Sequence, residues 1–250
     1  MDSPLHHLGQ TRSSHLRNHL LLTPDTFVRT TLPGMSKAAA IVHIGPALGA
    51  AFTEYTVECE SGGEFGPTAA QRFLYILDGS IHLEVAGKQH ALVGRGFAYI
   101  PEKLPHRITA SAASRVVVIE KLHQPLDSAP APQLIVSSED SVPSQALGGD
   151  ADLQVKCLLP EQAAYDFAVN TMTYQPGAAL SMVEMHIMEH GLLMLAGGGI
   201  YRLGDSWYPT TAGDFIWMGP WCPQWFGAIG KTPAKYLIYK DANRHPLAPR

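Results

Sequence analysis

The chain has 250 residues, of which 46% are hydrophobic and only 16% are charged, and its formal net charge is −4. This composition excludes intrinsic disorder, which requires few apolar residues and a high net charge, and the absence of a basic excess argues against nucleic-acid binding. The 23 glycines and 19 prolines would interrupt helices often, which argues against a helical bundle. No stretch reaches the roughly 18 uninterrupted apolar residues of a membrane-spanning helix, so we expect no membrane partner.

In chain order, the sequence predicts an N-terminal arm, then many short strands. Runs rich in β-branched and aromatic residues, such as residues 73–77, 80–85 and 114–119, are mostly closed by Gly, Pro, Asp or Asn, a pattern typical of β-sandwiches and barrels. Residues 124–133 contain three prolines and suit an extended linker. We therefore expect an all-β chain divided as follows: arm 1–23, first β-domain 24–123, linker 124–134, second β-domain 135–250.

The two predicted β-domains resemble each other. Three landmarks of the first recur in the second with a constant shift of 118 residues: Gly79 with Gly197, Pro101 with Gly219, and His106 with Gln224. Because the residue character around each landmark also agrees, we interpret the chain as a tandem duplication of one β-domain.

The second half contains a motif that is typical of a metal site. Glu184, His186 and His190 form the pattern E-x-H-x3-H. Glu184 and His186 are two residues apart, so on a strand both side chains point to the same face. Burial of such groups among apolar neighbours would be costly unless a cation compensated them. Two imidazoles and a carboxylate suit a divalent ion such as Mn, Fe or Ni and leave positions open for a substrate.

These motifs together resemble the cupin superfamily, and the duplication makes the chain resemble a bicupin. The usual cupin motif is H-x-H-x3,4-E with a later His, whereas this chain has E-x-H-x3-H with Gln224 at the later position. In this departure the chain resembles the (S)-ureidoglycine aminohydrolase family, whose members bind Mn in the C-terminal cupin. The resemblance covers nearly the whole chain from about residue 15 and is carried by three stretches: Phe27–Gly34, Val183–Trp225 and Tyr236–Arg244.

The resemblance implies roles for individual residues. The metal ligands would be Glu184, His186, His190 and Gln224, which would hold one Mn²⁺ per chain, although other divalent ions are possible. Tyr201, Tyr236 and Lys240 would bind a small-molecule substrate, and Lys240, Tyr236 and Glu184 would be the catalytic residues. Tyr236 and Lys240 are four residues apart, so they share a strand face, and a lysine there can bind a carboxylate as a point charge.

The first domain is expected to be free of metal. The shift of 118 residues places Gly66, Thr68 and Arg72 at the positions of Glu184, His186 and His190, and only His106, opposite Gln224, could ligate an ion. A single imidazole cannot hold a metal, and an arginine would repel it. We expect this domain to be a structural and oligomerisation partner.

The resemblance implies a hydrolase of ureide catabolism that releases ammonia from (S)-ureidoglycine and leaves (S)-ureidoglycolate. Two alternatives stay open: another metal-dependent bicupin, such as a dioxygenase or a decarboxylase, and a bicupin that binds a ligand without catalysis. We also expect a homo-oligomer, because cupin sheets commonly extend across subunits and the apolar Leu20, Leu21 and Leu22 of the arm could dock on a neighbour. The three cysteines, Cys59, Cys157 and Cys222, are odd in number and widely spaced, so a reducing cytoplasm is the expected location.

Overall fold

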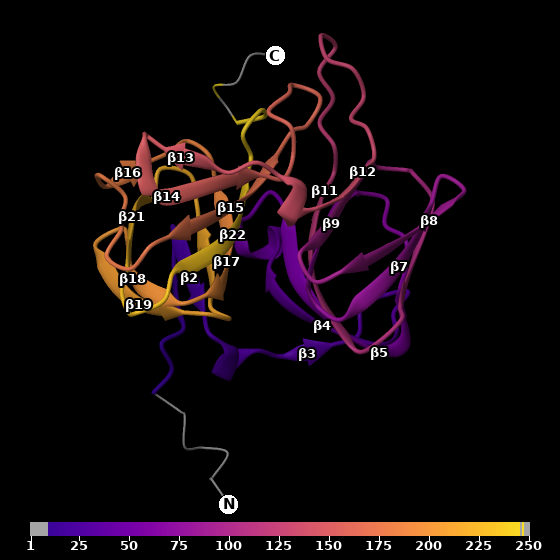
Figure 1. Cartoon of the computed structure of the whole chain (residues 1–250), viewed down its shortest axis with the longest axis horizontal. Coiled ribbons are helices and arrows are strands. Elements are labelled where there is room, and N and C mark those ends of the chain that lie inside the picture. The colour runs from indigo at the N-terminus through magenta and orange to yellow at the C-terminus, as the bar shows by residue number, and fades with distance from the viewer. Residues whose placement is uncertain (1–9, 246, 248–250) are drawn as a thin grey trace, which may run out of the picture. The chain divides into compact units, whose positions relative to one another are not determined.

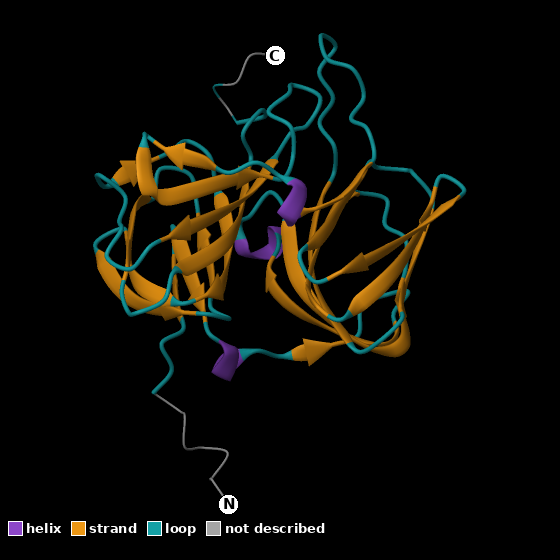
Figure 2. Cartoon of the chain, viewed as in Figure 1, coloured by secondary structure: helices purple, strands orange, loops and turns teal. Residues whose placement is uncertain are grey.

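Strands make up most of the described chain (Figure 2), which in this computed structural model comprises residues 10–245 and residue 247. Helical structure within these residues is limited to three 3-10 helices of one turn each: η1 (Pro24–Thr26), η2 (Pro46–Leu48) and η3 (Glu139–Ser141). No helix in this part of the chain is long and apolar enough to cross a membrane. The all-β class expected from the sequence is confirmed.

The strands form two compact units (Figure 1). The N-terminal unit comprises Val28–Pro143 together with Cys157–Ala168, and the C-terminal unit comprises the chain up to Phe27, Ser144–Lys156 and Val169–Leu247. Each unit has its own sheets, so the two-domain, bicupin organisation predicted from the repeat is present.

The N-terminal unit is built on one ten-stranded sheet, in which β12-β9-β6-β11-β5-β10-β7-β8 are neighbours and β3 and β4 join through β5. Strands were expected over residues 73–77, 80–85 and 114–119, and β6, β7 and β11 occupy these positions. The bounds are β3 (Arg29–Thr30), β4 (Ser36–Ile44), β5 (Thr53–Phe65), β6 (Gln71–Asp78), β7 (Ser80–Val85), β8 (Lys88–Val93), β9 (Gly96–Ile100), β10 (His106–Ala110), β11 (Ser114–Lys121) and β12 (Ile135–Ser138).

The C-terminal unit has an eight-stranded sheet, β1-β2-β20-β17-β22-β15-β14-β13, and a four-stranded sheet, β16-β21-β18-β19. The bounds are β1 (Ser14–Leu16), β2 (His19–Leu22), β13 (Gln145–Leu147), β14 (Asp150–Cys157), β15 (Ala168–Tyr174), β16 (Glu184–Met185), β17 (His190–Ala196), β18 (Gly198–Leu203), β19 (Ser206–Thr211), β20 (Phe215–Met218), β21 (Pro223–Ala228) and β22 (Ala234–Lys240).

Alternating side chains explain the core of the N-terminal unit. Leu74 and Ile76 of β6 and Val116 and Val118 of β11 are buried in one apolar cluster. Residues two apart on a strand point to the same face, so these strands line the core with every second side chain. Burial of a large aliphatic side chain contributes roughly 1.5–3 kcal/mol, and the cluster therefore holds the sheet in its curved form.

Two glycines that are equivalent in the repeat share one backbone conformation. Gly79 has a φ of 77° and Gly197 a φ of 64°, a left-handed region that favours glycine. A Cβ atom would overlap the carbonyl oxygen of Ala113 at Gly79 and that of Pro233 at Gly197. The duplication therefore extends to the same tight turn in both units.

Each unit also uses segments from outside its expected range. β12 pairs with β9 of the N-terminal unit, so the boundary expected at residue 135 lies inside this unit. Asp166 accepts hydrogen bonds from the side chain of Gln71 (2.6 Å) and the backbone N–H of Gln124 (2.9 Å), which anchors the segment 157–168 there. The C-terminal unit is therefore discontinuous in sequence, whereas a continuous domain 135–250 was expected.

The described part of the arm belongs to the C-terminal unit; residues 1–9 lie outside the described residues. β2 pairs with β20, as the indigo strand among the orange strands in Figure 1 shows. Leu20 and Leu21 are buried there, and Arg12 forms a bidentate ion pair with the buried Asp214 (2.6 and 2.9 Å). Leu20 and Leu21, offered as docking residues for another subunit, thus pack within their own chain.

Candidate metal and substrate site

The four-stranded sheet brings together Glu184, Gln224 and Tyr201. Glu184 of β16 lies directly opposite Gln224 of β21, and Tyr201 of β18 lies opposite Phe226, two residues further along β21. Residues directly opposite each other in an antiparallel pair share a face, with Cβ atoms roughly 5 Å apart. The carboxylate, the amide and the tyrosine therefore face the same side of this sheet, although they are distant in sequence.

The eight-stranded sheet places His190, Lys240 and Tyr236 on one face. His190 of β17 lies opposite Lys240 of β22, and Tyr236 lies opposite Met194. The shared face predicted for Tyr236 and Lys240 from their spacing is thus present. The pairing also places the ammonium group of Lys240 on the strand beside the predicted ligand His190, which the sequence spacing alone could not establish.

His186 connects the two sheets. Its Nε2 atom lies 3.1 Å from Oε2 of Glu184, and its ring centroid lies 5.3 Å from that of His190. Its backbone carbonyl accepts a hydrogen bond from the N–H of Trp221 (2.7 Å). About one third of each side chain of the Glu184–His186 pair is exposed, whereas His190 and Gln224 are buried. The four predicted ligands thus form a connected group with an exposed and a buried side.

Burial keeps His190 in the form that binds metals. The pKa of His190 lies well below its ordinary value, chiefly because burial disfavours the charged imidazolium, and also because Lys240 and His186 lie near it. Only neutral imidazole has a lone pair for a metal ion. Its buried Nδ1 atom has no hydrogen-bond partner among the described residues.

The donor types fit a divalent cation. Among the residues that the structure describes, no three His, Cys, Asp or Glu side chains converge on a single point. Glu184 and His186 instead contact each other through Oε2 and Nε2, two atoms that could ligate an ion. Two imidazoles, a carboxylate and an amide oxygen suit a borderline or hard divalent ion. Glu184, His190 and Gln224 lie on β16, β17 and β21, and His186 lies on the segment between β16 and β17.

The sequence did not single out Tyr174, the last residue of β15. Its hydroxyl lies 2.7 Å from that of Tyr236, and its ring packs edge-on against Phe226, with centroids 4.9 Å apart. The pKa of Tyr174 is raised, first by burial; that of Tyr201 is raised well above its ordinary value, also first by burial, with Tyr174 and Glu184 contributing. No local spacing signals this cluster, because β15 and β22 meet only through the order of strands in the sheet.

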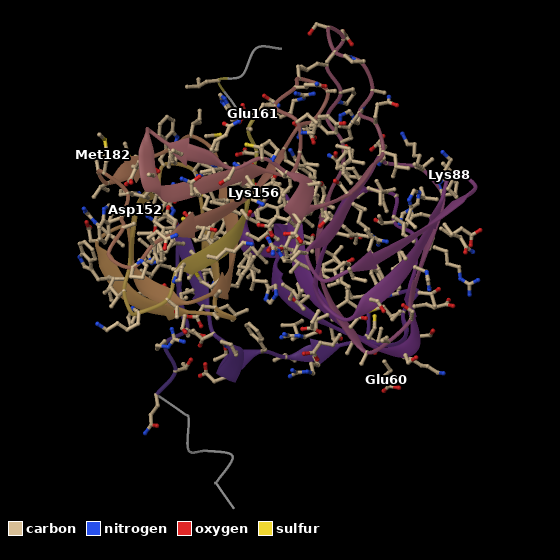
Figure 3. The ribbon with its side chains drawn as sticks, viewed as in Figure 1. Glu60, Lys88, Asp152, Lys156, Glu161 and Met182 are labelled. Carbon is tan, nitrogen blue, oxygen red and sulfur yellow. The ribbon has the colours of Figure 1, made fainter. Side chains whose placement is uncertain are left out.

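Two large apolar residues lie close to the predicted ligands in the chain or through backbone contact: Met182, two residues before Glu184, and Trp221, which bonds the backbone of His186. Met182 and Trp221 are exposed, and Figure 3 shows Met182 projecting at the outer edge of the C-terminal unit. Trp217 is instead buried and donates a hydrogen bond from Nε1 to Glu189 (3.1 Å). Cys222 is also buried, and burial raises the pKa of its thiol, so it packs as an uncharged side chain beside Gln224.

The equivalent positions of the N-terminal unit hold a guanidinium group. Arg72, equivalent to His190, donates from Nη1 to the carbonyl oxygen of Gly66 (2.8 Å) and contacts Nε2 of His106 at 2.9 Å. Gly66 and His106 are equivalent to Glu184 and Gln224, so three of the four repeat positions are in direct contact. Arg72 also forms an ion pair with Glu120 (2.5 Å). A cation belonging to the protein thus stands where the second domain has its predicted ligands.

Comparison with known proteins agrees with this architecture. The cupin domain family model matches residues 170–239. A probable (S)-ureidoglycine aminohydrolase from Oryza sativa is 40% identical over 242 residues, covering 96% of this chain and 78% of that protein. An (S)-ureidoglycine aminohydrolase from Escherichia coli is 32% identical over 234 residues, covering 91% of this chain and 89% of that protein. The chain belongs to the (S)-ureidoglycine aminohydrolase family.

Solved structures share this fold. The crystal structure of a glyoxylate-induced protein from Pseudomonas aeruginosa, described as putative, is 27% identical with a TM-score of 0.87, covering 96% of this chain and 94% of that chain. An oxalate decarboxylase from Bacillus subtilis has a TM-score of 0.67 at 12% identity, covering 94% of this chain and 80% of that chain. The second likeness is one of fold alone, so it gives no support to the decarboxylase alternative.

Proposed function

We propose that this protein hydrolyses (S)-ureidoglycine to (S)-ureidoglycolate and ammonia at the C-terminal unit. In this reaction water forms the new C–O bond at the α-carbon, and the C–N bond to the amino group breaks as ammonia leaves. The observation that carries the proposal is the connected group of Glu184, His186, His190 and Gln224, with Lys240 on the strand beside it, in a chain of this family.

We further propose that these four residues hold one divalent ion per chain, Mn²⁺ or a similar ion. When bound, such an ion would neutralise developing charge and orient the substrate. The ion would replace the hydrogen bond that now joins Glu184 and His186. Support comes from the donor types and from the low pKa of His190, which keeps that imidazole neutral.

The remaining site residues supply binding and orientation. Lys240 would bind the substrate carboxylate as a point charge, and the hydroxyls of Tyr201 and Tyr236 would hydrogen-bond polar atoms of the substrate. Correct orientation of a bound substrate contributes a large part of many rate enhancements. Glu184 would act at the metal itself, and the apolar Met182 and Trp221 would limit the access of bulk water.

The N-terminal unit is proposed to bind no metal, because the guanidinium group of Arg72 occupies the equivalent positions. A homo-oligomer and a cytoplasmic location remain part of the proposal. With Leu20 and Leu21 packed within their own chain, the case for an oligomer depends only on the tendency of cupin sheets to extend across subunits.

The test is ammonia release from freshly prepared (S)-ureidoglycine by the purified protein, with Mn²⁺ and after chelation, corrected for spontaneous decay. We expect metal-dependent release, about one divalent ion per chain, and loss of both in Glu184→Ala and His190→Ala. Glu60→Gln, at an exposed position of the N-terminal unit (Figure 3), is the matched control and should retain both. Release by wild type no faster than spontaneous decay, or unchanged release by Glu184→Ala, would refute the proposal.

A second measurement distinguishes the proposed hydrolysis from the dioxygenase alternative. Oxygen consumption should not accompany turnover with either Mn²⁺ or Fe²⁺, because replacement of an amino group by water changes no oxidation state. Oxygen uptake in proportion to substrate loss would favour the dioxygenase alternative.

A further inference from the structure

Two tyrosine hydroxyls meet in the interior of the C-terminal unit. The oxygen atoms of Tyr174 and Tyr236 are 2.7 Å apart, and both side chains are buried. The two hydroxyls carry two hydrogens, and the bond between them uses one. Neither hydroxyl has another hydrogen-bond partner among the described residues, so one buried hydrogen has no acceptor. A buried donor without an acceptor costs about 1–3 kcal/mol, a cost that a polar ligand would remove.

We propose that Tyr174 is a positioning residue for the substrate, which acts through Tyr236. Tyr174 donates its hydrogen to the oxygen of Tyr236, and Tyr236 donates its own hydrogen to an oxygen of the bound substrate. This inference rests on the proposed function. The distance alone allows either hydroxyl to donate. We assign the donation to Tyr174 because it leaves the O–H of Tyr236, the predicted substrate-binding residue, available to the substrate, and because an oxygen that accepts a hydrogen bond becomes a stronger donor.

Packing around Tyr174 holds its hydroxyl in place. Phe226 contacts the rings of both Tyr174 and Tyr236, with centroid distances of 4.9 and 5.8 Å. Phe226 also lies two residues from Gln224 on the same face of β21. The tyrosine pair, on the eight-stranded sheet, therefore packs against the face of the four-stranded sheet that carries a predicted metal ligand. The carboxylate of Glu184 is near enough to raise the pKa of both tyrosines, although burial is the larger cause for each.

The test compares Tyr174→Phe, Tyr236→Phe and the double variant. Phenylalanine retains the ring that packs on Phe226 and removes only the hydroxyl, so folding should be preserved. Tyr174→Phe removes the first of the two proposed hydrogen bonds, the one from Tyr174 to Tyr236. We therefore expect the KM for (S)-ureidoglycine to rise about fivefold. The metal content should stay at the wild-type value, and the loss of the buried hydrogen bond should lower the free energy of unfolding by no more than about 1 kcal/mol. The Kd for (S)-ureidoglycolate, measured by calorimetry without turnover, should rise similarly.

The double variant distinguishes positioning from packing. If Tyr174 acts through Tyr236, Tyr174→Phe should have no further effect on KM in the Tyr236→Phe background. Tyr208→Phe is the matched control, because its hydroxyl bonds His19 and Ser14 of the arm (2.9 and 3.2 Å); its KM should be unchanged. If the wild type is active, two results would overturn this inference but not the proposed function: effects of the two substitutions on KM that add in the double variant, or an unchanged KM and Kd in Tyr174→Phe. Wild type without activity would overturn the proposed function and this inference together.

Discussion

Removal of Arg72 should destabilise the N-terminal unit far more than removal of a surface arginine. Its side chain is 4% exposed and contacts Glu120, Gly66 and His106. Its guanidinium carbon also lies 5.7 Å from the centroid of the Phe65 ring. The variant Arg72→Met leaves the carboxylate of Glu120, which is 19% exposed, without its cation.

The magnitude follows from that unpaired carboxylate. Removal of one partner of a buried ion pair costs roughly 3–5 kcal/mol, because the other charge stays desolvated. The remaining partial exposure of Glu120 places the expected cost near the lower end, at about 3 kcal/mol. Replacement of both members, as in Arg72→Met/Glu120→Met, should recover most of this loss, because neither charge then requires a partner.

The assay is urea unfolding followed by a probe of the N-terminal unit, with Arg107→Ala as control. Arg107 forms an exposed ion pair with Glu64 (2.5 Å), so its removal should cost less than about 1 kcal/mol. The reasoning is refuted if Arg72→Met costs no more than Arg107→Ala, or if the double variant is less stable than Arg72→Met.

Three further predictions concern stability. Burial raises the pKa of Glu54 to about 8 from 4.5. The protonated folded state is therefore not penalised below pH 4.5, and the free energy of unfolding falls as pH rises from 4.5 toward 8. The stability of Glu54→Gln relative to wild type should thus increase by about 4 kcal/mol between pH 5 and pH 9; a difference that does not change with pH would contradict this. Arg12→Ala leaves the buried Asp214 without its cation and should lower stability by about 3 kcal/mol in thermal unfolding. Arg12→Lys keeps the charge but loses the bidentate contact, so it should lose less stability than Arg12→Ala. Chelation should lower the unfolding temperature of wild type but not of Glu184→Ala.

The sequence by itself determined the features that depend on local spacing. Gly79 and Gly197 mark the repeat because a left-handed turn without space for Cβ accepts only glycine. Tyr236 and Lys240 share a face because side chains alternate along any strand. The E-x-H-x3-H motif named candidate ligands, but the alternation expected for Glu184 and His186 on one strand is absent, because β16 ends at Met185 and His190 begins β17 of the other sheet. The glycine turns and the shared face of Tyr236 and Lys240 follow from residues within one strand or turn.

Only the tertiary structure decided which strands meet. It paired Glu184 with Gln224 and His190 with Lys240, joined Tyr174 to Tyr236 across 62 residues, and gave Arg72 its partners. It also docked the arm on β20 and moved the segment 157–168 into the N-terminal unit. Contacts between distant strands depend on the order and register of strands in the sheet, and the same set of predicted strands is compatible with several orders and registers. The physical reason is that hydrogen bonds between backbones carry no residue identity, so long-range pairing is selected only by the packing of the whole chain.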